Sequence, residues 1–340
     1  EFRRVLFRSA VTPPAPTGLF FVNISDELNR TDPLQDIHSH GVAFAEVNPD
    51  NFPDYYLTRA IEGLSRRDFY YLNSFANFNE RAGFAGIRDE TDDDGSYGAA
   101  WADLDNDGDY DLVNASTFAE GNPTPGFPAP NNVYQNDGTG VFTNNTDPDI
   151  AATAIESRSV VAFDMDADGD LDLFSISNAD NAGVKEAYLN DGSFAFTPHA
   201  GGDLTSATVP TTLGLIDTDY DGDGDIDILA GNLARDPGFD GEFTILQNDG
   251  SGTFSRILPS TLGIVDLVGN RDDAGAGVTT ADFDNDGDLD MLLLSPNEAN
   301  LWRNDGGTYT YVQTFFSTEG YSGAFADRKS TRLNSSHRCI

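Results

Sequence analysis

The 340-residue sequence contains 57 acidic and 19 basic residues, which gives a formal net charge of −38 at pH 7. A chain this acidic repels nucleic acid and anionic membrane surfaces, so neither is expected as a partner. Aromatic residues make up 11% of the chain and no apolar run reaches 18 residues, which argues against a disordered chain and against a membrane-spanning helix.

The two ends differ in composition from the rest of the chain. Residues 1–9 and 328–340 hold seven of the 19 basic residues and the single cysteine. Both segments resemble sequencing-adapter DNA translated in frame, and we exclude them from the fold. If so, the native sequence is truncated at both ends and a signal peptide would not be visible.

A linker and two partial strands lie next to these ends. Residues 10–17 are rich in proline and are typical of a linker. Residues 18–25, "GLFFVNIS", predict a lone fourth strand, and residues 320–327, "GYSGAFAD", predict the first strand of a further repeat. The repeat region therefore extends over residues 18–327.

A nine-residue acidic motif organises this region. It is incomplete at residues 46–54 (loop 1) and complete at 103–111 (loop 2), 164–172 (loop 3), 219–227 (loop 4) and 282–290 (loop 5). The complete copies begin 61, 55 and 63 residues apart, and we number the positions 1 to 9 within each loop. Five copies at a period near 60 residues indicate a repeat architecture.

A second element follows each loop. Four copies read Asn-Asp-Gly between apolar or aromatic flanks, at residues 136–138, 190–192, 248–250 and 304–306, and the first repeat has "YYLNSFANF" instead. Asn-Asp-Gly favours a tight hairpin turn. Each unit therefore predicts four short strands, with the acidic loop between the first two and the Asn-Asp-Gly turn between the last two.

Four antiparallel strands per 60-residue unit are typical of a blade in a β-propeller. We predict an all-β fold of five full blades plus partial first and last strands; a β-solenoid or a string of small domains is the alternative. In an up-and-down blade the acidic loops and the Asn-Asp-Gly turns share one face of the ring.

The alternating carboxylates predict calcium binding. Calcium takes six to eight oxygen ligands, which a tight loop supplies from side chains at positions 1, 3, 5 and 9 and the carbonyl at position 7, with glycine at position 6 for the turn. Without a cation, neighbouring carboxylates repel each other by ~1 to 4 kcal/mol per pair. The alternative is that these segments are merely acidic, well-solvated hairpin loops.

The side-chain ligands of this prediction are Asp103, Asp105, Asp107 and Asp111 in loop 2, Asp164, Asp166, Asp168 and Asp172 in loop 3, Asp219, Asp221, Asp223 and Asp227 in loop 4, and Asp282, Asp284, Asp286 and Asp290 in loop 5. The carbonyl ligands come from Asp109, Asp170, Asp225 and Asp288. Loop 1 offers a weaker fifth set, namely Glu46, Asn48, Asp50 and Asp54, with Asn51 at the glycine position.

The ladder D-x-D-x-D-G-D-x-D, followed by an apolar strand and an Asn-x-Gly turn, resembles the FG-GAP/VCBS repeat family, which includes the integrin α-chain propellers. "HSHGVAFAEVN" and "YSGAFAD" are most similar to the bacterial branch related to cartilage acidic protein. The resemblance implies a seven-bladed parent with structural calcium, secreted or at the cell surface, in adhesion or ligand recognition. Some fungal lectins and some polysaccharide lyases use the same architecture.

We expect a protein or polysaccharide ligand on the face opposite the calcium loops, which carries the long connections 88–97, 117–131, 197–209 and 262–275. No nucleophile motif or phosphate loop occurs, so we predict no enzyme. A polysaccharide-processing enzyme is the alternative. The three histidines of the repeat region are His38, His40 and His199, of which His38 and His40 could reach a metal or a substrate; turn-lining histidines are the alternative. Arg59, Arg66 and Arg67 form the nearest basic cluster, with a solvated patch as the alternative.

Overall fold

A computed structural model describes most of the repeat region. The described residues are 41–58, 68–74, 77–80, 85–87, 96–116, 129–155, 157–177, 185–206, 212–232, 244–264, 277–294 and 298–316. The two partial strands predicted at residues 18–25 and 320–327 lie outside these ranges, as do both adapter-like ends.

The described strands form five four-stranded antiparallel sheets, each built from consecutive strands. Blade 1 contains β1 (Val42–Ala45), β2 (Asp54–Leu57), β3 (Phe69–Ser74) and β4 (Asn77–Glu80). Blade 2 contains β5 (Ser96–Ala102), β6 (Asp111–Ser116), β7 (Asn132–Asn136) and β8 (Phe142–Asn144). Blade 3 contains β9 (Ser157–Phe163), β10 (Asp172–Ser177), β11 (Lys185–Asn190) and β12 (Phe196–Pro198).

Blade 4 contains β13 (Thr212–Thr218), β14 (Asp227–Asn232), β15 (Thr244–Asn248) and β16 (Phe254–Ile257). Blade 5 contains β17 (Gly277–Ala281), β18 (Asp290–Leu294), β19 (Glu298–Asn304) and β20 (Tyr309–Phe316). Two short helices join neighbouring blades, α1 (Pro148–Ala152) and the 3-10 helix η2 (Pro259–Leu262). Sequence reasoning predicted only strands and missed both helices.

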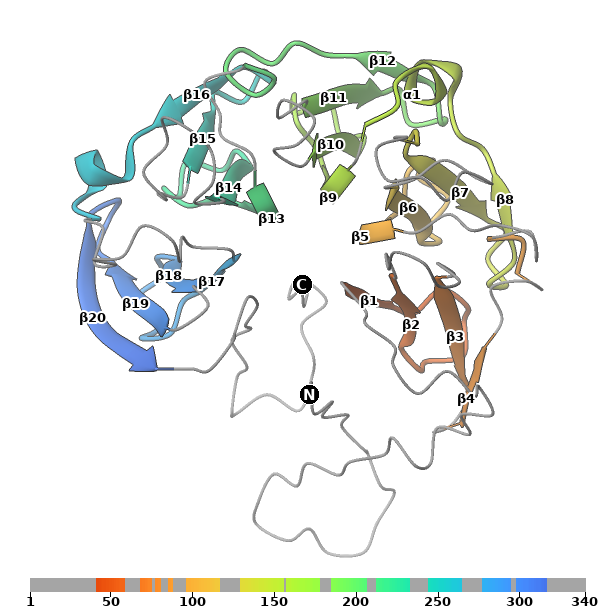
Figure 1. Cartoon of the computed structure of the whole chain (residues 1–340), viewed down its shortest axis with the longest axis horizontal. Helices are drawn as coiled ribbons and strands as arrows, with labels where there is room; N and C mark the ends of the chain where they lie inside the picture. Colours follow the sequence, from red (N-terminus) through yellow and green to blue (C-terminus); the bar gives the residue numbers. More distant parts are fainter. Residues whose placement is uncertain are drawn as a thin grey trace, which may run out of the picture.

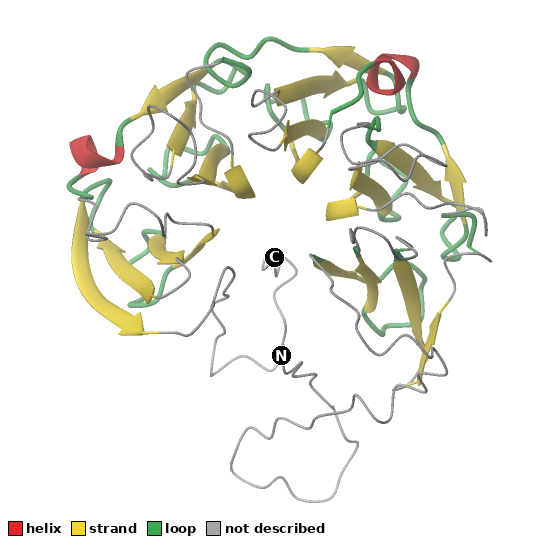
Figure 2. Ribbon diagram, in the orientation of Figure 1, coloured by secondary structure: helices red, strands yellow, loops and turns green. Residues whose placement is uncertain are grey.

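The five blades follow one another around a common centre, as Figure 1 shows. The first strand of each blade lies nearest the centre and the fourth lies at the periphery (Figure 1). Figure 2 shows the same arc, in which yellow strands joined by green loops form every blade and red helices occur only as short segments. The predicted all-β propeller of five four-stranded blades is therefore confirmed.

The hydrophobic core lies between the blades. Four clusters of buried side chains each draw on two neighbouring blades: one joins blades 1 and 2, and the others join 2 and 3, 3 and 4, and 4 and 5. The second strands of the first three blades, β2, β6 and β10, are buried along their whole length. In β6 and β10 this burial includes polar side chains such as Asn114 and Ser175 as well as the apolar ones.

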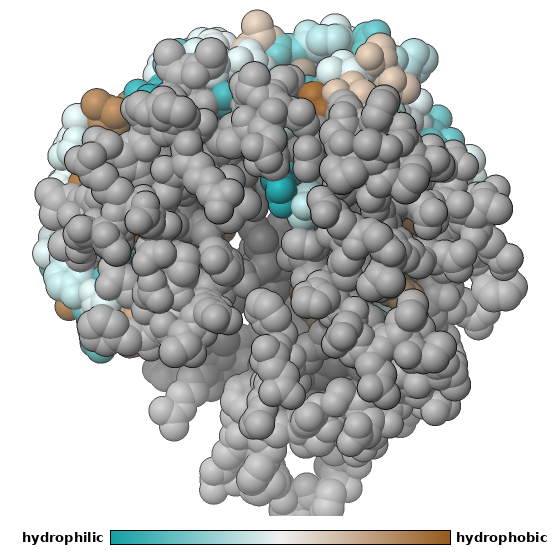
Figure 3. Space-filling view, in the orientation of Figure 1, coloured by the Kyte–Doolittle hydropathy of each residue, from teal (hydrophilic) through white to brown (hydrophobic). Residues whose placement is uncertain are grey.

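The outermost strands have only one covered face. In β8 and β12 the leading phenylalanine is buried and the two following residues are exposed. Where Figure 3 colours the periphery it is mostly hydrophilic, with hydrophobic residues scattered among the polar ones. The described part of the chain contains no helix with the length and apolarity needed to cross a bilayer.

Candidate metal centre

The acidic loops lie where the sequence predicts them, between the first and second strands of the blades. Loop 2 begins directly after β5 and its last residue, Asp111, opens β6. The chain reverses direction through left-handed residues at positions 4 and 6, which in loop 2 are Asn106 (φ 59°) and Gly108 (φ 96°). Asparagine and glycine adopt this conformation at least cost, so the motif suits the turn.

The aspartate at position 1 holds the turn in shape. Both oxygens of Asp103 accept backbone hydrogen bonds, one from the Asp107 N–H at 3.1 Å and the other from the Gly108 N–H at 3.0 Å. The equivalent residues of loops 3, 4 and 5 make the same two bonds. The position 1 carboxylate therefore stabilises the turn of each loop by accepting hydrogen bonds from the backbone of the same loop.

The aspartate at position 9 is a buried joint between the loop and the third strand. Asp111 is 1% exposed, and its oxygens accept from the Leu104 N–H at 2.9 Å and the Asn136 N–H at 2.8 Å. The same pair of bonds, from position 2 and from the asparagine of the Asn-Asp-Gly turn, recurs at Asp172, Asp227 and Asp290. Each carboxylate retains lone pairs for a cation, since its two oxygens offer about four acceptor sites.

The aspartate at position 3 supplies the atom that lacks a partner. In loops 2, 3 and 4 the Oδ1 atoms of Asp105, Asp166 and Asp221 are buried and accept no hydrogen bond. In loops 2 and 4 the other oxygen accepts from a glutamine side chain, Gln135 at 2.6 Å and Gln247 at 2.5 Å. A buried oxygen without a partner is costly, and its recurrence at one loop position fits a cation ligand.

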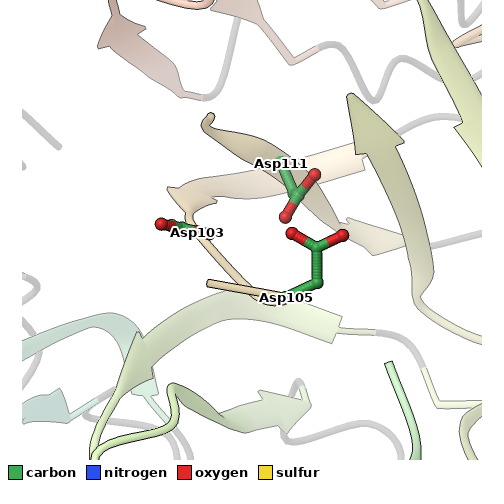
Figure 4. Close-up of side chains that lie close together, drawn as sticks. All are labelled: Asp103, Asp105 and Asp111. Atoms are coloured by element: carbon green, nitrogen blue, oxygen red, sulfur yellow. The ribbon is translucent and has the colours of Figure 1, made fainter. Parts of the chain in front are cut away.

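Positions 1, 3 and 9 converge in every complete loop. The four triads are Asp103, Asp105 and Asp111; Asp164, Asp166 and Asp172; Asp219, Asp221 and Asp227; and Asp282, Asp284 and Asp290. Within each triad the potential ligand oxygens lie within 4.8 Å of one another. In Figure 4 the carboxylates of Asp105 and Asp111 face each other, with Asp103 to one side. The hard, anionic oxygen set fits calcium, so Asp103, Asp105 and Asp111 and their counterparts would hold it.

The remaining aspartates of the motif point elsewhere. At position 5, Asp107 accepts the Asp109 N–H at 2.9 Å and belongs to no triad. At position 7, the side chains lie against the glycine of the Asn-Asp-Gly turn in the same blade, where the Gly306 N–H donates to Asp288 at 2.7 Å. Position 5 as a side-chain ligand and position 7 as a carbonyl ligand stay predictions.

Burial and like charge raise the pKa of the position 9 carboxyls. Desolvation is the main cause and raises the pKa of Asp111, Asp172 and Asp227 from 3.8 to about 7, against the opposing effect of their backbone hydrogen bonds. The carboxylates at positions 3 and 5 add to the increase. The folded protein thus holds negative charge in these loops at an energetic cost that a bound cation would remove.

Loop 1 has the same buried aspartate at position 9 as the other loops but lacks the carboxylate at position 3. Asp54 accepts from the Val47 N–H at 3.3 Å and the Asn73 N–H at 2.7 Å, as in the other blades. Position 3 is Asn48, whose amide nitrogen, in the orientation that satisfies both groups, lies 3.1 Å from the oxygens of Asp50. Loop 1 therefore has one carboxylate fewer in its triad than the others.

Sequence reasoning missed a second role of the turn asparagines. The side-chain amide of Asn136 donates to the Val47 carbonyl in blade 1 at 2.8 Å and to the Tyr110 carbonyl of its own loop at 3.1 Å. We interpreted Asn-Asp-Gly only as a hairpin turn. The one available signal was that asparagine occupies the first position of all four turns, where a two-residue turn alone does not require it.

The other candidate residues lie mostly outside the described ranges. These include His38, His40, Arg59, Arg66 and Arg67, together with most of the long connections expected to bind a ligand. His199 is described, and its Nε2 lies 2.8 Å from the Gly252 carbonyl, between blades 3 and 4. That contact gives His199 a structural role at this boundary, and its charge also acts on Asp166 in loop 3.

Comparison with protein-family models identifies the repeats. The FG-GAP-like repeat model matches residues 121–175 and 219–293, which include loops 3, 4 and 5. No curated protein shows a significant sequence match.

Three solved structures align over most of this chain. A lectin from Agrocybe aegerita, described as recognising non-reducing terminal N-acetylglucosamine, aligns with a TM-score of 0.49 and 16% identity over 83% of this chain and 67% of the lectin. The V. cholerae biofilm matrix protein Bap1 aligns with a TM-score of 0.45 and 14% identity over 88% of this chain and 45% of its own. An exotype rhamnogalacturonan lyase, YesX, gives 0.42 and 13%, with 80% and 48% covered.

The chain thus spans about two thirds of the lectin and less than half of Bap1 and of the lyase. At no more than 16% identity, what these proteins bind or cleave is not transferred to this chain. The chain is thus a five-bladed β-propeller in which residues 121–175 and 219–293 match the FG-GAP-like repeat.

Proposed function

We propose that the chain is a calcium-binding β-propeller module that recognises a protein or glycan ligand outside the cell and catalyses no reaction. Calcium in this proposal is structural. The triads of loops 2 to 5 hold one ion each, and loop 1 provides a weaker fifth site.

The observation that carries the proposal is the repeated unpartnered oxygen at position 3. Asp105, Asp166 and Asp221 each bury one carboxylate oxygen with no donor, and each belongs to a triad whose potential ligand oxygens lie within 4.8 Å of one another. Solvated acidic loops would leave these oxygens in water. A divalent cation would pair them and neutralise the repulsion within each triad.

Calcium would stabilise the fold through the position 9 joint. Each triad brings together the start of the loop, its middle and the first residue of the second strand, which also holds the third strand. At ten times its Kd, each ion adds roughly 1.4 kcal/mol to the free energy of unfolding. Four ions add about 5 to 6 kcal/mol, comparable with the ~5 to 15 kcal/mol of a typical domain.

Ligand recognition is proposed for the face opposite the calcium loops. The acidic loops and the Asn-Asp-Gly turns are tied together by hydrogen bonds on one face, so their residues already have structural roles. The connection at 197–209 does not fit this expectation, because its described residues pack against the turn between β15 and β16 on the acidic-loop face, where the His199 ring lies 2.8 Å from the Gly252 carbonyl. The proposal therefore rests on the connections 88–97, 117–131 and 262–275, which lie mostly outside the described residues. Extracellular calcium sites often bind at ~10⁻⁴ to 10⁻³ M, which suits open loops of this kind.

A glycan and protein array probed with the purified chain tests the recognition proposal. We expect a reproducible ligand whose binding falls when a chelator removes calcium. Incubation with uronic-acid polysaccharides is the parallel assay. Product release there, without stable binding on the array, would reject the non-catalytic module in favour of a polysaccharide-processing enzyme.

A further inference from the structure

The same hydrogen bond crosses each of the four described boundaries between consecutive blades. The turn asparagine of one blade donates from its side-chain amide to the carbonyl at position 2 of the preceding blade's acidic loop. The bonds are Asn136 to Val47 at 2.8 Å, Asn190 to Leu104 at 2.8 Å, Asn248 to Met165 at 2.9 Å and Asn304 to Tyr220 at 3.1 Å. All four asparagines are at least 95% buried.

These bonds join one candidate calcium ligand to the next. Asp111 accepts from the Leu104 N–H at 2.9 Å, the Leu104 carbonyl accepts from the Asn190 amide, and the Asn190 N–H donates to Asp172 at 2.8 Å. Three hydrogen bonds and two residues therefore separate the position 9 aspartates of loops 2 and 3. The pattern continues through Met165 and Asn248 to Asp227, and through Tyr220 and Asn304 to Asp290.

On the basis of the calcium sites proposed above, we propose that the turn asparagines couple these sites, so that calcium in one loop raises the affinity of the loop in the neighbouring blade. A cation on Asp172 fixes that carboxylate, and with it the Asn190 backbone and side chain. The peptide group of Leu104 is then held before loop 2 binds its own ion. Because part of the ordering cost is met by the first ion, the second binds more tightly.

Asn190 is in this sense a positioning residue. Its side-chain nitrogen donates to two carbonyls, those of Leu104 and Leu171, and through them it holds the acidic loops of both blades. Loops 2 and 3 also share a second link, in which the Asn106 amide donates to Asp170 at 2.7 Å. Asn106 has a left-handed backbone (φ 59°), so Asn106→Gly removes that link without straining the turn.

The two tryptophans of the chain allow one loop to be observed alone. Trp101 lies two residues before Asp103, within about 7 Å along the strand, and Trp302 lies in blade 5. In a Trp302→Phe, Asn106→Gly parent, Tb³⁺ luminescence sensitised by Trp101 reports metal at loop 2. Loss of this signal in Asp105→Asn confirms the assignment to loop 2 rather than loop 1.

The test measures the Tb³⁺ affinity of loop 2 with loop 3 intact and with loop 3 impaired by Asp166→Asn. This change removes a charge from the loop 3 triad but leaves the hydrogen bonds of Asp172 in place. We expect Asp166→Asn to raise the Kd at loop 2 about fivefold or more in the parent. When Asn190→Leu is also present, Asp166→Asn should leave the Kd at loop 2 unchanged.

Asn248→Leu is the matched control. It removes the equivalent bond between blades 3 and 4, with a similar loss of stability, and leaves the link between loops 2 and 3 intact. The effect of Asp166→Asn on loop 2 should survive in this variant. Should Asn190→Leu fail to fold, Asn190→Ser, which is smaller and too short to reach Leu104, takes its place.

Two results overturn the coupling. The first is that Asp166→Asn leaves the Kd at loop 2 unchanged in the parent. The second is that Asp166→Asn changes this Kd by the same factor in the Asn190→Leu background as in the Asn248→Leu background. Both outcomes leave metal binding itself intact. Complete absence of sensitised emission from the parent would instead reject the calcium sites, and the coupling with them.

Discussion

The side-chain amide of Asn190 lies 2.8 Å from the carbonyl oxygen of Leu104, a residue 86 positions earlier and in the neighbouring blade. If this amide is removed, the buried carbonyls of Leu104 and Leu171 each lose the hydrogen bond that it donates. Asn190→Leu should therefore lower the free energy of unfolding by about 1–3 kcal/mol, measured by denaturant unfolding. Asn145→Leu, at an exposed asparagine, should change it by no more than about 0.5 kcal/mol. Equal effects would contradict the bridging role.

The stability of the calcium-free protein should depend on pH in a defined direction. The pKa values of Asp111, Asp172 and Asp227 are raised from 3.8 to about 7, so the folded state binds more protons than the unfolded state between these values. The free energy of unfolding should then be highest below about pH 4 and fall as the pH rises to about 7.

Saturating calcium should reduce or reverse this loss, because the cation binds the ionised carboxylates. Glu186, which lies in none of the five loops, also has a pKa raised to about 7 by burial and contributes a similar slope. Glu186→Gln removes that contribution. A calcium-free protein that gains stability from about pH 5 to about pH 8 would rule out this interpretation of the loops.

Loop 1 differs from a complete loop at position 3. Asn48→Asp places a third carboxylate beside Glu46 and Asp54, and we expect calorimetry to show tighter calcium binding at this weaker fifth site than in the wild type. Asn51→Gly, which supplies the glycine of position 6 (φ 65°) without new charge, is the control and should tighten binding less. An unchanged Kd at loop 1 in Asn48→Asp would show that charge is not what loop 1 lacks.

Loop 5 should be the weakest of the four complete sites. The residue before the turn asparagine is glutamine in blades 2 and 4 but Arg303 in blade 5, where its charge acts on Asp284. Arg303 also forms an ion pair with Asp305 at 2.8 Å. Arg303→Gln removes a competing positive charge and should tighten binding at loop 5, measured by Tb³⁺ luminescence sensitised by Trp302. Weaker binding in this variant would show that the charge of Arg303 does not oppose the cation.

The repeat and its chemistry could be predicted from sequence because both depend on local patterns. The spacing of the acidic motifs gives five blades, and strand alternation on either side of each loop gives the first two strands. The interblade bonds could not be predicted in this way. The Asn190–Leu104 contact depends on how two blades are stacked, and no pattern within one repeat contains that information.

The different structural roles of the five aspartates in each loop could not be predicted from the sequence either. Every odd position carries the same residue type, yet Asp103 closes the turn, Asp111 is buried between strands, and Asp107 belongs to no triad. Which carboxylates converge depends on the left-handed residues at positions 4 and 6 and on the hydrogen bonds that fix them.

The most direct test of structural calcium is the melting temperature of the purified chain, with the metal removed and then with calcium restored at millimolar concentration. Four ions at ten times their Kd should raise it by about 10 °C or more, and equimolar magnesium should raise it less because it demands a smaller, octahedral site. A melting temperature that is the same in chelator and in calcium would contradict the account.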